Sequence, residues 1–287
     1  MSIISSASQI YRKEGLLPLV RKSNRYAFEK VLRAPVVDDL LYYSSRKDLK
    51  IQMDSEEDIS DIIDTVVNVR PGYGHYKVYS IQLSDELYQL LKLVRKENTE
   101  RVLEIGTANG GSFYTWCRGI PDIKRVVSLD LPNGRYGGGY NERKINIFKS
   151  FSDEINMEFV RGNSHKKPTY KKVKNIANND GFDFIFIDGD HSFEGVKKDF
   201  HMYKQLLSDD GVIALHDIIH HPDDPDIVRE RKMNTDAKDR HLNWGIAHPD
   251  VNVKKFWDEV CEEYKTKEIV SHPDQTWGGI GVVYPKS

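Results

Sequence analysis

Short apolar runs alternate with longer amphipathic segments over the last two thirds of the chain. The runs are rich in β-branched and aromatic residues and have the length of β-strands. Five of them lie at Arg101–Ile105, Arg125–Leu131, Met157–Val160, Phe182–Ile187 and Gly211–Leu215. Segments of helical length separate them, and this alternation predicts parallel strands joined by helical crossovers.

The run Phe184–Ile187 is apolar at every position, as expected for a strand covered by helices on both faces of a sheet. Two further strands are predicted near Glu268–Val270 and Ile280–Val283. The sequence therefore predicts an α/β fold over residues 81–287, a doubly wound, mostly parallel, Rossmann-like sheet of seven strands. Ligands of such sheets bind outside the carboxyl ends of the strands, so the residues after each run are the candidates for function.

The first 80 residues lack this alternation and are predicted to form a helical N-terminal extension. Residues 1–33 hold seven basic and two acidic side chains, a local charge of +5. Apolar residues at spacings of three and four predict short amphipathic helices in this segment. These helices either pack on the domain or contact a membrane surface or another partner.

Composition narrows the class of protein. With 39% apolar and 30% charged residues the chain is globular, and a net charge of -2 gives no basic field for a nucleic acid. No apolar run approaches the roughly 20 residues that cross a bilayer, and no secretory pattern is present. We therefore expect a cytoplasmic protein, with peripheral membrane contact through residues 1–33 as an alternative. Cys117 and Cys261 are expected to be reduced, buried thiols.

A glycine-rich turn follows the first run. Gly106, Gly110 and Gly111 allow the backbone to approach a bound ligand closely, and a helix is predicted directly after them. The spacing is not that of a dinucleotide or phosphate loop, because Ala108 takes the second glycine position. The carboxylate of Glu104 would repel a pyrophosphate but suits a cationic ligand.

Polar residues at the next two strand ends extend this candidate pocket. Asp130 ends the second run, where a carboxylate can accept both hydroxyls of a ribose. Asn163 and Ser164 follow the third run, and their side chains can hydrogen-bond an adenine edge. A nucleoside without phosphates fits these strand ends best.

Acidic and imidazole side chains follow the fourth and fifth runs. Asp188 and His191 come after the fourth run, and His216 and Asp217 come after the fifth. Because the two strands are expected to be neighbours, the aspartates converge, and carboxylates repel one another unless a cation or a proton intervenes. A divalent metal is one explanation, and the other is that the aspartates cap the segments that follow them.

Together these strand ends resemble the S-adenosylmethionine pocket of class I methyltransferases, and Glu-Ile-Gly-Thr-x-x-Gly-Gly-Ser resembles that superfamily's first motif. The resemblance implies cofactor contacts in the turn and at the later strand ends. The implied cofactor-binding residues are Glu104, Gly106, Thr107, Ala108, Gly110, Gly111, Ser112, Asp130, Asn163, Ser164 and Asp188.

Two later tracts, Phe-Ile-Phe-Ile-Asp-Gly-Asp-His-Ser-Phe and Val-Ile-Ala-Leu-His-Asp-Ile, resemble one branch of these enzymes, the macrolide-sugar O-methyltransferases and cephalosporin-hydroxylase-like proteins. The resemblance implies a metal at Asp188, His216 and Asp217 and catalysis by Asp188 and His191, with His191 as the general base. His216 departs from the branch, which has a carboxylate there, and imidazole suits Mn²⁺, Fe²⁺ or Zn²⁺ better than Mg²⁺. The alternative for His191 is a structural role.

The sequence thus predicts an S-adenosylmethionine-dependent O-methyltransferase, assisted by a divalent metal, Mg²⁺ or Mn²⁺. We expect its acceptor to be a hydroxyl of a small molecule, a sugar or a lipid-linked glycan, and the protein to be a homo-oligomer. An NAD-dependent oxidoreductase and a non-catalytic nucleoside-binding module are the alternatives. The loops 131–141 and 220–250 are candidate substrate lids or ordinary polar loops.

Overall fold

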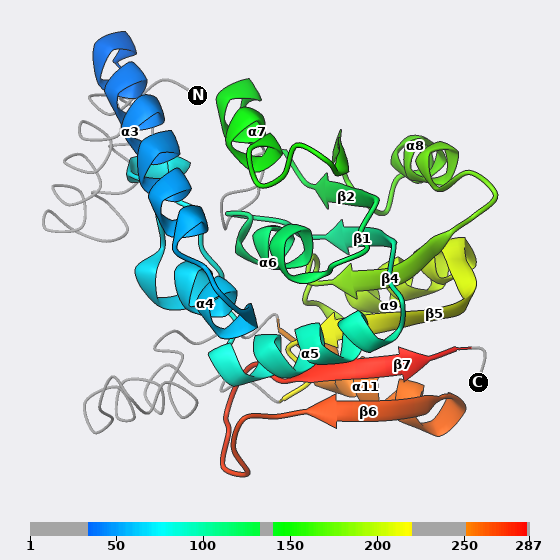
Figure 1. The fold of residues 1–287 in the computed structure, drawn as a ribbon. Coiled ribbons are helices and arrows are strands. Elements are labelled where there is room, and N and C mark those ends of the chain that lie inside the picture. Colours follow the sequence, from blue (N-terminus) through cyan, green and yellow to red (C-terminus); the bar gives the residue numbers. More distant parts are fainter. Residues whose placement is uncertain (1–33, 133–139, 220–250, 286–287) are drawn as a thin grey trace, which may run out of the picture.

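The structure, a computed structural model, describes residues 34–132, 140–219 and 251–285. Its centre is a seven-stranded sheet with the strand order β3-β2-β1-β4-β5-β7-β6, shown in Figure 1. The strands are β1 (Arg101–Ile105), β2 (Arg125–Asp130), β3 (Asn156–Arg161), β4 (Phe182–Ile187), β5 (Leu207–His216), β6 (Lys265–Ile269) and β7 (Ile280–Tyr284). The first five strands are parallel, and β7 pairs antiparallel with both β5 and β6. The predicted fold class is confirmed.

Helices cover both faces of this sheet. They are α3 (Pro35–Asp54), α4 (Ile59–Asp64), α5 (Ser84–Lys96), α6 (Gly111–Gly119), α7 (Glu142–Lys149), α8 (Lys167–Ala177), α9 (Phe193–Tyr203) and α11 (Val253–Glu263). Short helical turns lie at Thr65–Val69, Gly74–Tyr76 and Lys204–Leu206. None of the described helices combines the length and the apolar composition needed to span a bilayer.

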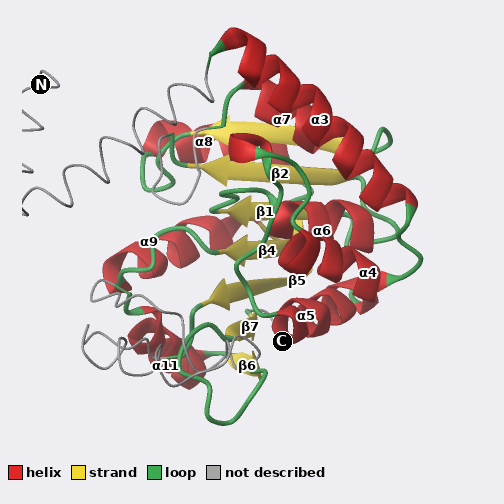
Figure 2. Cartoon of the chain, turned by 90° about the vertical axis from the view of Figure 1, so that its left-hand side faces the viewer, coloured by secondary structure: helices red, strands yellow, loops and turns green. Residues whose placement is uncertain are grey.

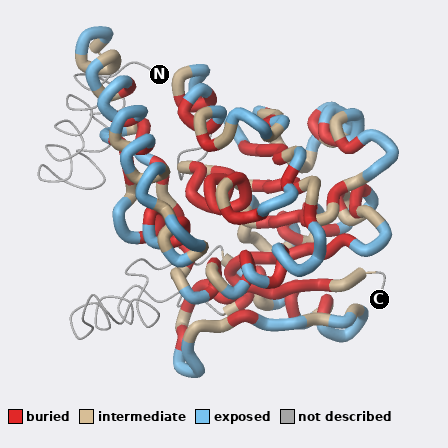
Figure 3. Tube along the Cα trace, viewed as in Figure 1, coloured by how far each residue is buried: buried red, intermediate tan, exposed pale blue. Residues whose placement is uncertain are grey.

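The core has two halves, one on each face of the sheet, because side chains alternate along every strand. Val102 of β1 belongs to the half covered by α5, α6 and α7, whereas its neighbour Leu103 belongs to the half covered by α8, α9 and α11. Figure 2 shows these two helical layers, and Figure 3 shows that the central strands are buried almost throughout. This double covering is the reason that the strands are apolar at successive positions.

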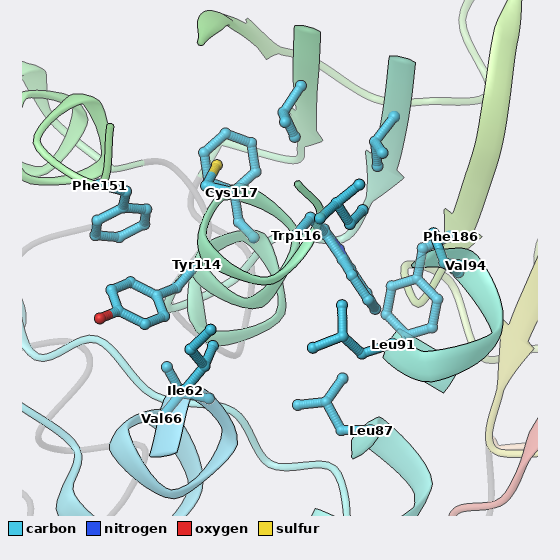
Figure 4. Packing of buried hydrophobic residues seen from close by; sticks show 14 of the residues in the cluster. Ile62, Val66, Leu87, Leu91, Val94, Tyr114, Trp116, Cys117, Phe151 and Phe186 are labelled. Carbon is cyan, nitrogen blue, oxygen red and sulfur yellow. The ribbon is translucent and has the colours of Figure 1, made fainter. Parts of the chain in front are cut away.

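The N-terminal extension packs into the first of these halves. Ile62 and Val66 lie against Tyr114 of α6 and Leu87 of α5, as Figure 4 shows. Residues 34–80 and the sheet therefore share one apolar core. The outer face of α3 is different, since its large apolar side chains are exposed: Val36, Leu40, Tyr43 and Ile51.

Several details differ from the expectations. β5 begins at Leu207, earlier than predicted, since Leu207 pairs with Phe182 across a bulge. Cys261 is exposed, so the prediction of two buried thiols is wrong for this residue, which lies on the outer side of α11, whereas Cys117 is buried. Residues 1–33, most of the first candidate lid and all of the second lie outside the described residues.

Candidate active site

The register of the parallel strands brings four predicted site residues to one level of the sheet. Ile105 of β1 pairs with Leu129 of β2 and with Ile187 of β4, and Ile187 pairs with Leu215 of β5. The residues that come next are Gly106, Asp130, Asp188 and His216. They form a row at the carboxyl edge of the sheet, on the side where α3 lies in Figures 1 and 2.

The turn after β1 has the backbone shape that its glycines predict. Gly106 and Gly110 have φ values of +97° and +82°, in the left-handed region that glycine tolerates best. Ala108, between them, also has a positive φ of 47°. The turn then leads into α6, whose first residue is Gly111.

The glycines of the turn also have a packing role, and the predicted close approach to a ligand stays a prediction. A Cβ on Gly106 would lie 2.1 Å from the backbone oxygen of Asp188, and one on Gly111 would lie 2.2 Å from the backbone nitrogen of Ser80. A Cβ on Gly110 would lie 2.3 Å from the ring of Phe148. The missing side chains thus make room for neighbouring parts of the same chain, which packs tightly around the turn.

Glu104 lies beneath the turn and is fully buried. Its Oε1 accepts a hydrogen bond from Trp116 Nε1 at 3.0 Å, while Oε2 is buried without a hydrogen-bond partner among the described residues. Burial raises the pKa of Glu104 to about 7. An unpartnered carboxylate oxygen beside the turn fits a cationic ligand, as S-adenosylmethionine is.

Asp130 braces the turn from β2. Its Oδ2 accepts a hydrogen bond from the backbone N–H of Ala108 at 2.5 Å. Burial raises the pKa of Asp130 to about 6, although the backbone N–H groups of Ala108 and Leu131 counteract the shift. The structure thus shows a loop-positioning role, and the contact of Asp130 with a ribose stays a prediction.

The remaining predicted cofactor residues lie in or just after the turn and at the end of β3, and they differ in how far they are buried. Thr107 and Ser112 are buried, and Thr107 Oγ1 accepts a hydrogen bond from Ser128 Oγ at 2.8 Å. Asn163 and Ser164 are half-buried at the end of β3, where Asn163 Oδ1 accepts from the backbone N–H of His165 at 2.8 Å. Their contact with adenine stays a prediction.

Two carboxylates and two imidazoles form a compact cluster at the ends of β4 and β5. His216 Nδ1 lies 2.9 Å from Asp188 Oδ1 and 3.4 Å from Asp217 Oδ1. His191 Nδ1 lies 2.6 Å from Asp217 Oδ2, and its Nε2 lies 3.5 Å from Asp188 Oδ1. Because an ionised carboxylate only accepts, the Nδ1 atoms donate these bonds. The structure therefore brings all four predicted residues together.

Charge within this cluster is balanced by the imidazoles. Burial alone would lower the pKa of His216, but attraction to Asp217 and Asp188 raises it to about 10. The pKa of His191 is raised in the same way, with burial opposed mainly by Asp217. The side chain of His191 is also the most accessible of the four, at 25% exposure. This partial exposure of the side chain suits an exchange of protons.

The donor atoms fit a divalent ion. One ligand atom each from Asp188, His191 and Asp217 lies within 4.8 Å of the others. Metal bonds of about 2.0 to 2.2 Å hold donors within roughly 4.4 Å of each other, so a small adjustment of these side chains suffices. This group contains His191 in place of the predicted ligand His216.

Two residues of this site carry no motif in the sequence. Gln82, buried just before α5, donates from Nε2 to Asp188 Oδ2 at 2.5 Å. Glu86 of α5 is fully buried and accepts from the backbone N–H of Gly279 at 3.0 Å. The backbone N–H of Ile219 donates to Gly278 O at 2.9 Å and links the segment after β5 to the segment before β7. The bond between Glu86 and Gly279 therefore attaches α5 to the same place. Neither partner lies near in sequence, so no spacing could reveal these bonds.

A comparison with protein families finds one match, which covers the central part of the chain. Residues 103–218 match the family model described as "Methyltransferase domain". The match begins in β1 and ends just beyond Asp217, so it contains most of the site. This part of the chain matches a methyltransferase domain, which agrees with the predicted class of enzyme.

Curated relatives are similar over a limited part of the chain. An uncharacterised protein of Acanthamoeba polyphaga mimivirus is 30% identical over 115 residues, which cover 40% of this chain and 50% of that protein. An uncharacterised protein of Sinorhizobium fredii is 25% identical over 129 residues, 44% of this chain and 14% of that protein. The chain thus spans half the length, or less, of these relatives.

Solved structures with a similar fold are more distant in sequence. The O-methyltransferase from Bacillus cereus in complex with SAH is 19% identical with a TM-score of 0.49, covering 85% of this chain and 99% of that one. The O-methyltransferase TomG from Streptomyces achromogenes, in complex with SAM, is 13% identical with a TM-score of 0.46, covering 85% and 97%.

Proposed function

We propose that this chain transfers the methyl group of S-adenosylmethionine to a hydroxyl oxygen of a small molecule, a sugar or glycan. The observation that carries the proposal is the direct contact of two parts of the site. Gly106, in the glycine turn, packs on the backbone of Asp188, in the cluster of carboxylates and imidazoles. A cationic methyl donor at the turn would therefore lie beside groups that can take a proton.

The residues have distinct tasks in this reaction. Methyl transfer is an in-line displacement, so the turn and Asp130 would hold the donor in line with the acceptor oxygen. His191 would accept the hydroxyl proton at Nε2, with its Nδ1–H held by Asp217. For that purpose His191 must be neutral, and its raised pKa therefore favours activity at alkaline pH.

A divalent ion between Asp188 and Asp217 is part of the proposal. When bound, such an ion would make the acceptor hydroxyl more acidic. We assign His216 as its imidazole ligand, because Nδ1 of His216 faces both carboxylates and would bind the ion once it has released its proton. This leaves His191 free to accept the proton. Mn²⁺ suits a mixed set of oxygen and nitrogen donors better than Mg²⁺ does.

Calorimetry tests the class of ligand. We expect S-adenosylhomocysteine to bind and NAD not to bind; binding of NAD alone would refute the methyltransferase and favour an oxidoreductase. Transfer of radioactive methyl from S-adenosylmethionine to a panel of sugars, with and without EDTA, tests the reaction. Binding without turnover on any hydroxyl would favour a nucleoside-binding module. Full turnover in the presence of EDTA would refute the role of a metal.

The location and partners of the protein belong to the proposal as well. We propose a cytoplasmic homo-oligomer that meets its acceptor, free or lipid-linked, through contact of residues 1–33 with a membrane surface. The support is the charge of +5 in that segment, since each basic side chain near anionic lipid contributes about 1 kcal/mol.

A further inference from the structure

We propose that Gln82 is a positioning residue that sets the orientation of the Asp188 carboxylate. The proposal rests on the proposed function and extends it to the connector between the N-terminal extension and α5. It starts from the partners of Asp188, whose two oxygens are bound differently. Oδ2 accepts from Gln82 Nε2 at 2.5 Å, whereas Oδ1 accepts from His216 Nδ1 at 2.9 Å.

Gln82 is itself held in one orientation. It is 4% exposed, and its Oε1 accepts a hydrogen bond from Ser80 Oγ. A carboxylate offers no proton, so the NH2 end of the amide has to face Asp188 and the oxygen end has to face Ser80. Ser80 is anchored in turn, because its backbone N–H donates to Val66 O at 2.9 Å.

The connector also touches the other half of the site. A Cβ on Gly111, the first residue of α6, would lie 2.2 Å from the backbone of Tyr79 and of Ser80. The segment Tyr79–Gln82 is therefore wedged between the glycine turn and the carboxylate cluster. A shift of this segment would move both halves together.

The chemistry of an amide explains why glutamine suits this position. Its N–H group orients a carboxylate by a charge-assisted hydrogen bond but adds no charge to the cluster. The amide therefore leaves the charge of the cluster unchanged, and Oδ1 stays turned toward the imidazoles. Without the amide, the carboxylate is free to rotate about its Cβ–Cγ bond, and Oδ2, in a side chain only 11% exposed, loses its partner.

The test compares Gln82→Met, which keeps the length of the side chain but has no N–H donor, with Gln82→Glu, which keeps its shape but offers only acceptors when ionised. Gln89→Met and Gln89→Glu, on the exposed face of α5, are the matched controls. Three readouts are measured: the NMR signal of the His216 Nδ1 proton in the ligand-free protein, Mn²⁺ affinity by electron paramagnetic resonance, and S-adenosylhomocysteine affinity by calorimetry. The His216 signal is assigned by its loss in His216→Asn.

We expect both Gln82 variants to shift or broaden the His216 signal and to weaken Mn²⁺ binding by about tenfold or more, the effect of losing a hydrogen bond to a charged group. S-adenosylhomocysteine affinity should change little, since the glycine turn contacts the backbone of Tyr79 and Ser80 and not the side chain of Gln82. Should Gln82→Met fail to fold, Gln82→Asn, whose amide is one methylene short of Asp188, is expected to give the same result.

Three outcomes overturn the proposal. One is a His216 signal that is the same in the Gln82 and Gln89 variants. Another is an Mn²⁺ affinity that is the same in the Gln82 variants as in a wild-type protein that binds Mn²⁺. The third is an equal loss of both affinities and of the melting temperature, which would show a general loosening. A wild-type protein that binds neither Mn²⁺ nor S-adenosylhomocysteine refutes the proposed function instead, while the His216 signal still tests Gln82.

Discussion

The glycine turn after β1 and the carboxylate cluster after β4 and β5 touch one another through Gly106 and Asp188, yet different interactions hold them in place. The turn is held by backbone conformation and by close packing, with positive φ values at Gly106, Ala108 and Gly110. The cluster is held by hydrogen bonds between ionisable side chains. Substitutions in the turn should therefore affect folding first, and substitutions in the cluster should affect chemistry first.

The largest effect is expected from Gly106→Val, which should destabilise the fold by about 4 kcal/mol or more. A β-branched side chain is strained at a φ of +97°, and its Cβ would overlap the backbone at Asp188. Urea unfolding followed by circular dichroism measures the change.

Gly189→Ala is the control for this prediction, because the nearest atom to its added Cβ would be the side-chain methyl of Ile105, at 3.2 Å, and its other neighbours would lie at 3.6 Å. It should cost far less than Gly106→Val. A Gly106→Val protein as stable as the wild type would contradict the idea that packing holds the turn.

In the cluster, His191→Ala and His216→Ala should separate proton transfer from ion binding. We expect His191→Ala to lower kcat by about 10²- to 10⁴-fold, the usual contribution of a general base, while Mn²⁺ affinity is nearly kept. His216→Ala should lose Mn²⁺ affinity. The reverse pattern would make His191 the ligand and remove its role as the base.

Glu104 shares a feature with each region: it is ionisable, like the residues of the cluster, and it is buried in tight packing beside the glycine turn. Its pKa in the folded protein is about 7, above the ordinary 4.5, so the folded state keeps a proton that the unfolded state releases. The stability from this group is complete below pH 4.5 and is lost as the pH rises through about 7. The loss should be about 3 kcal/mol.

Chemical denaturation of wild type and Glu104→Gln between pH 4 and 8.5 or so measures this dependence. Glutamine stays neutral and still accepts from Trp116, so its stability should be flatter with pH. Glu100→Gln, a carboxylate near the surface beside Lys124, is the control. Parallel curves for all three proteins would mean that Glu104 does not titrate in this range.

Asp130→Ala should weaken S-adenosylhomocysteine binding by about 10- to 100-fold, because hydrogen bonds to a charged group are lost. Part of the loss would come through the turn, since Asp130 also holds the N–H of Ala108. Asp130→Asn keeps an acceptor for that N–H and should be milder. Unchanged affinity by calorimetry in the alanine variant would refute the ribose contact.

The smallest effect on the enzyme itself is expected from deletion of residues 1–33. The shortened protein should lose salt-sensitive sedimentation with anionic liposomes but keep its melting temperature and its methyl transfer to a soluble acceptor. A full-length protein that ignores liposomes, or a shortened one that unfolds, would show that the segment serves the fold.

Sequence alone predicted the sheet and the convergence at its edge. β1 and β4 have the predicted bounds, because a run of apolar and β-branched residues is a local signal. Asp188 and Asp217 were expected to meet because consecutive parallel strands commonly become neighbours, a rule that needs no side-chain detail. The glycine turn was predicted from its glycines directly after the first strand, and the structure adds that these glycines pack against other parts of the protein.

Tertiary structure alone decided which groups hold these residues in place. Gln82 and Asp188 are 106 positions apart, and Glu86 lies 193 positions from Gly279, so no periodicity or spacing links them. The exposure of Cys261 could not be predicted either, because it depends on which face of α11 packs against the sheet. Local patterns record the environment of neighbouring residues in the chain, whereas hydrogen bonds between distant segments exist only once the sheet has brought those segments to one edge.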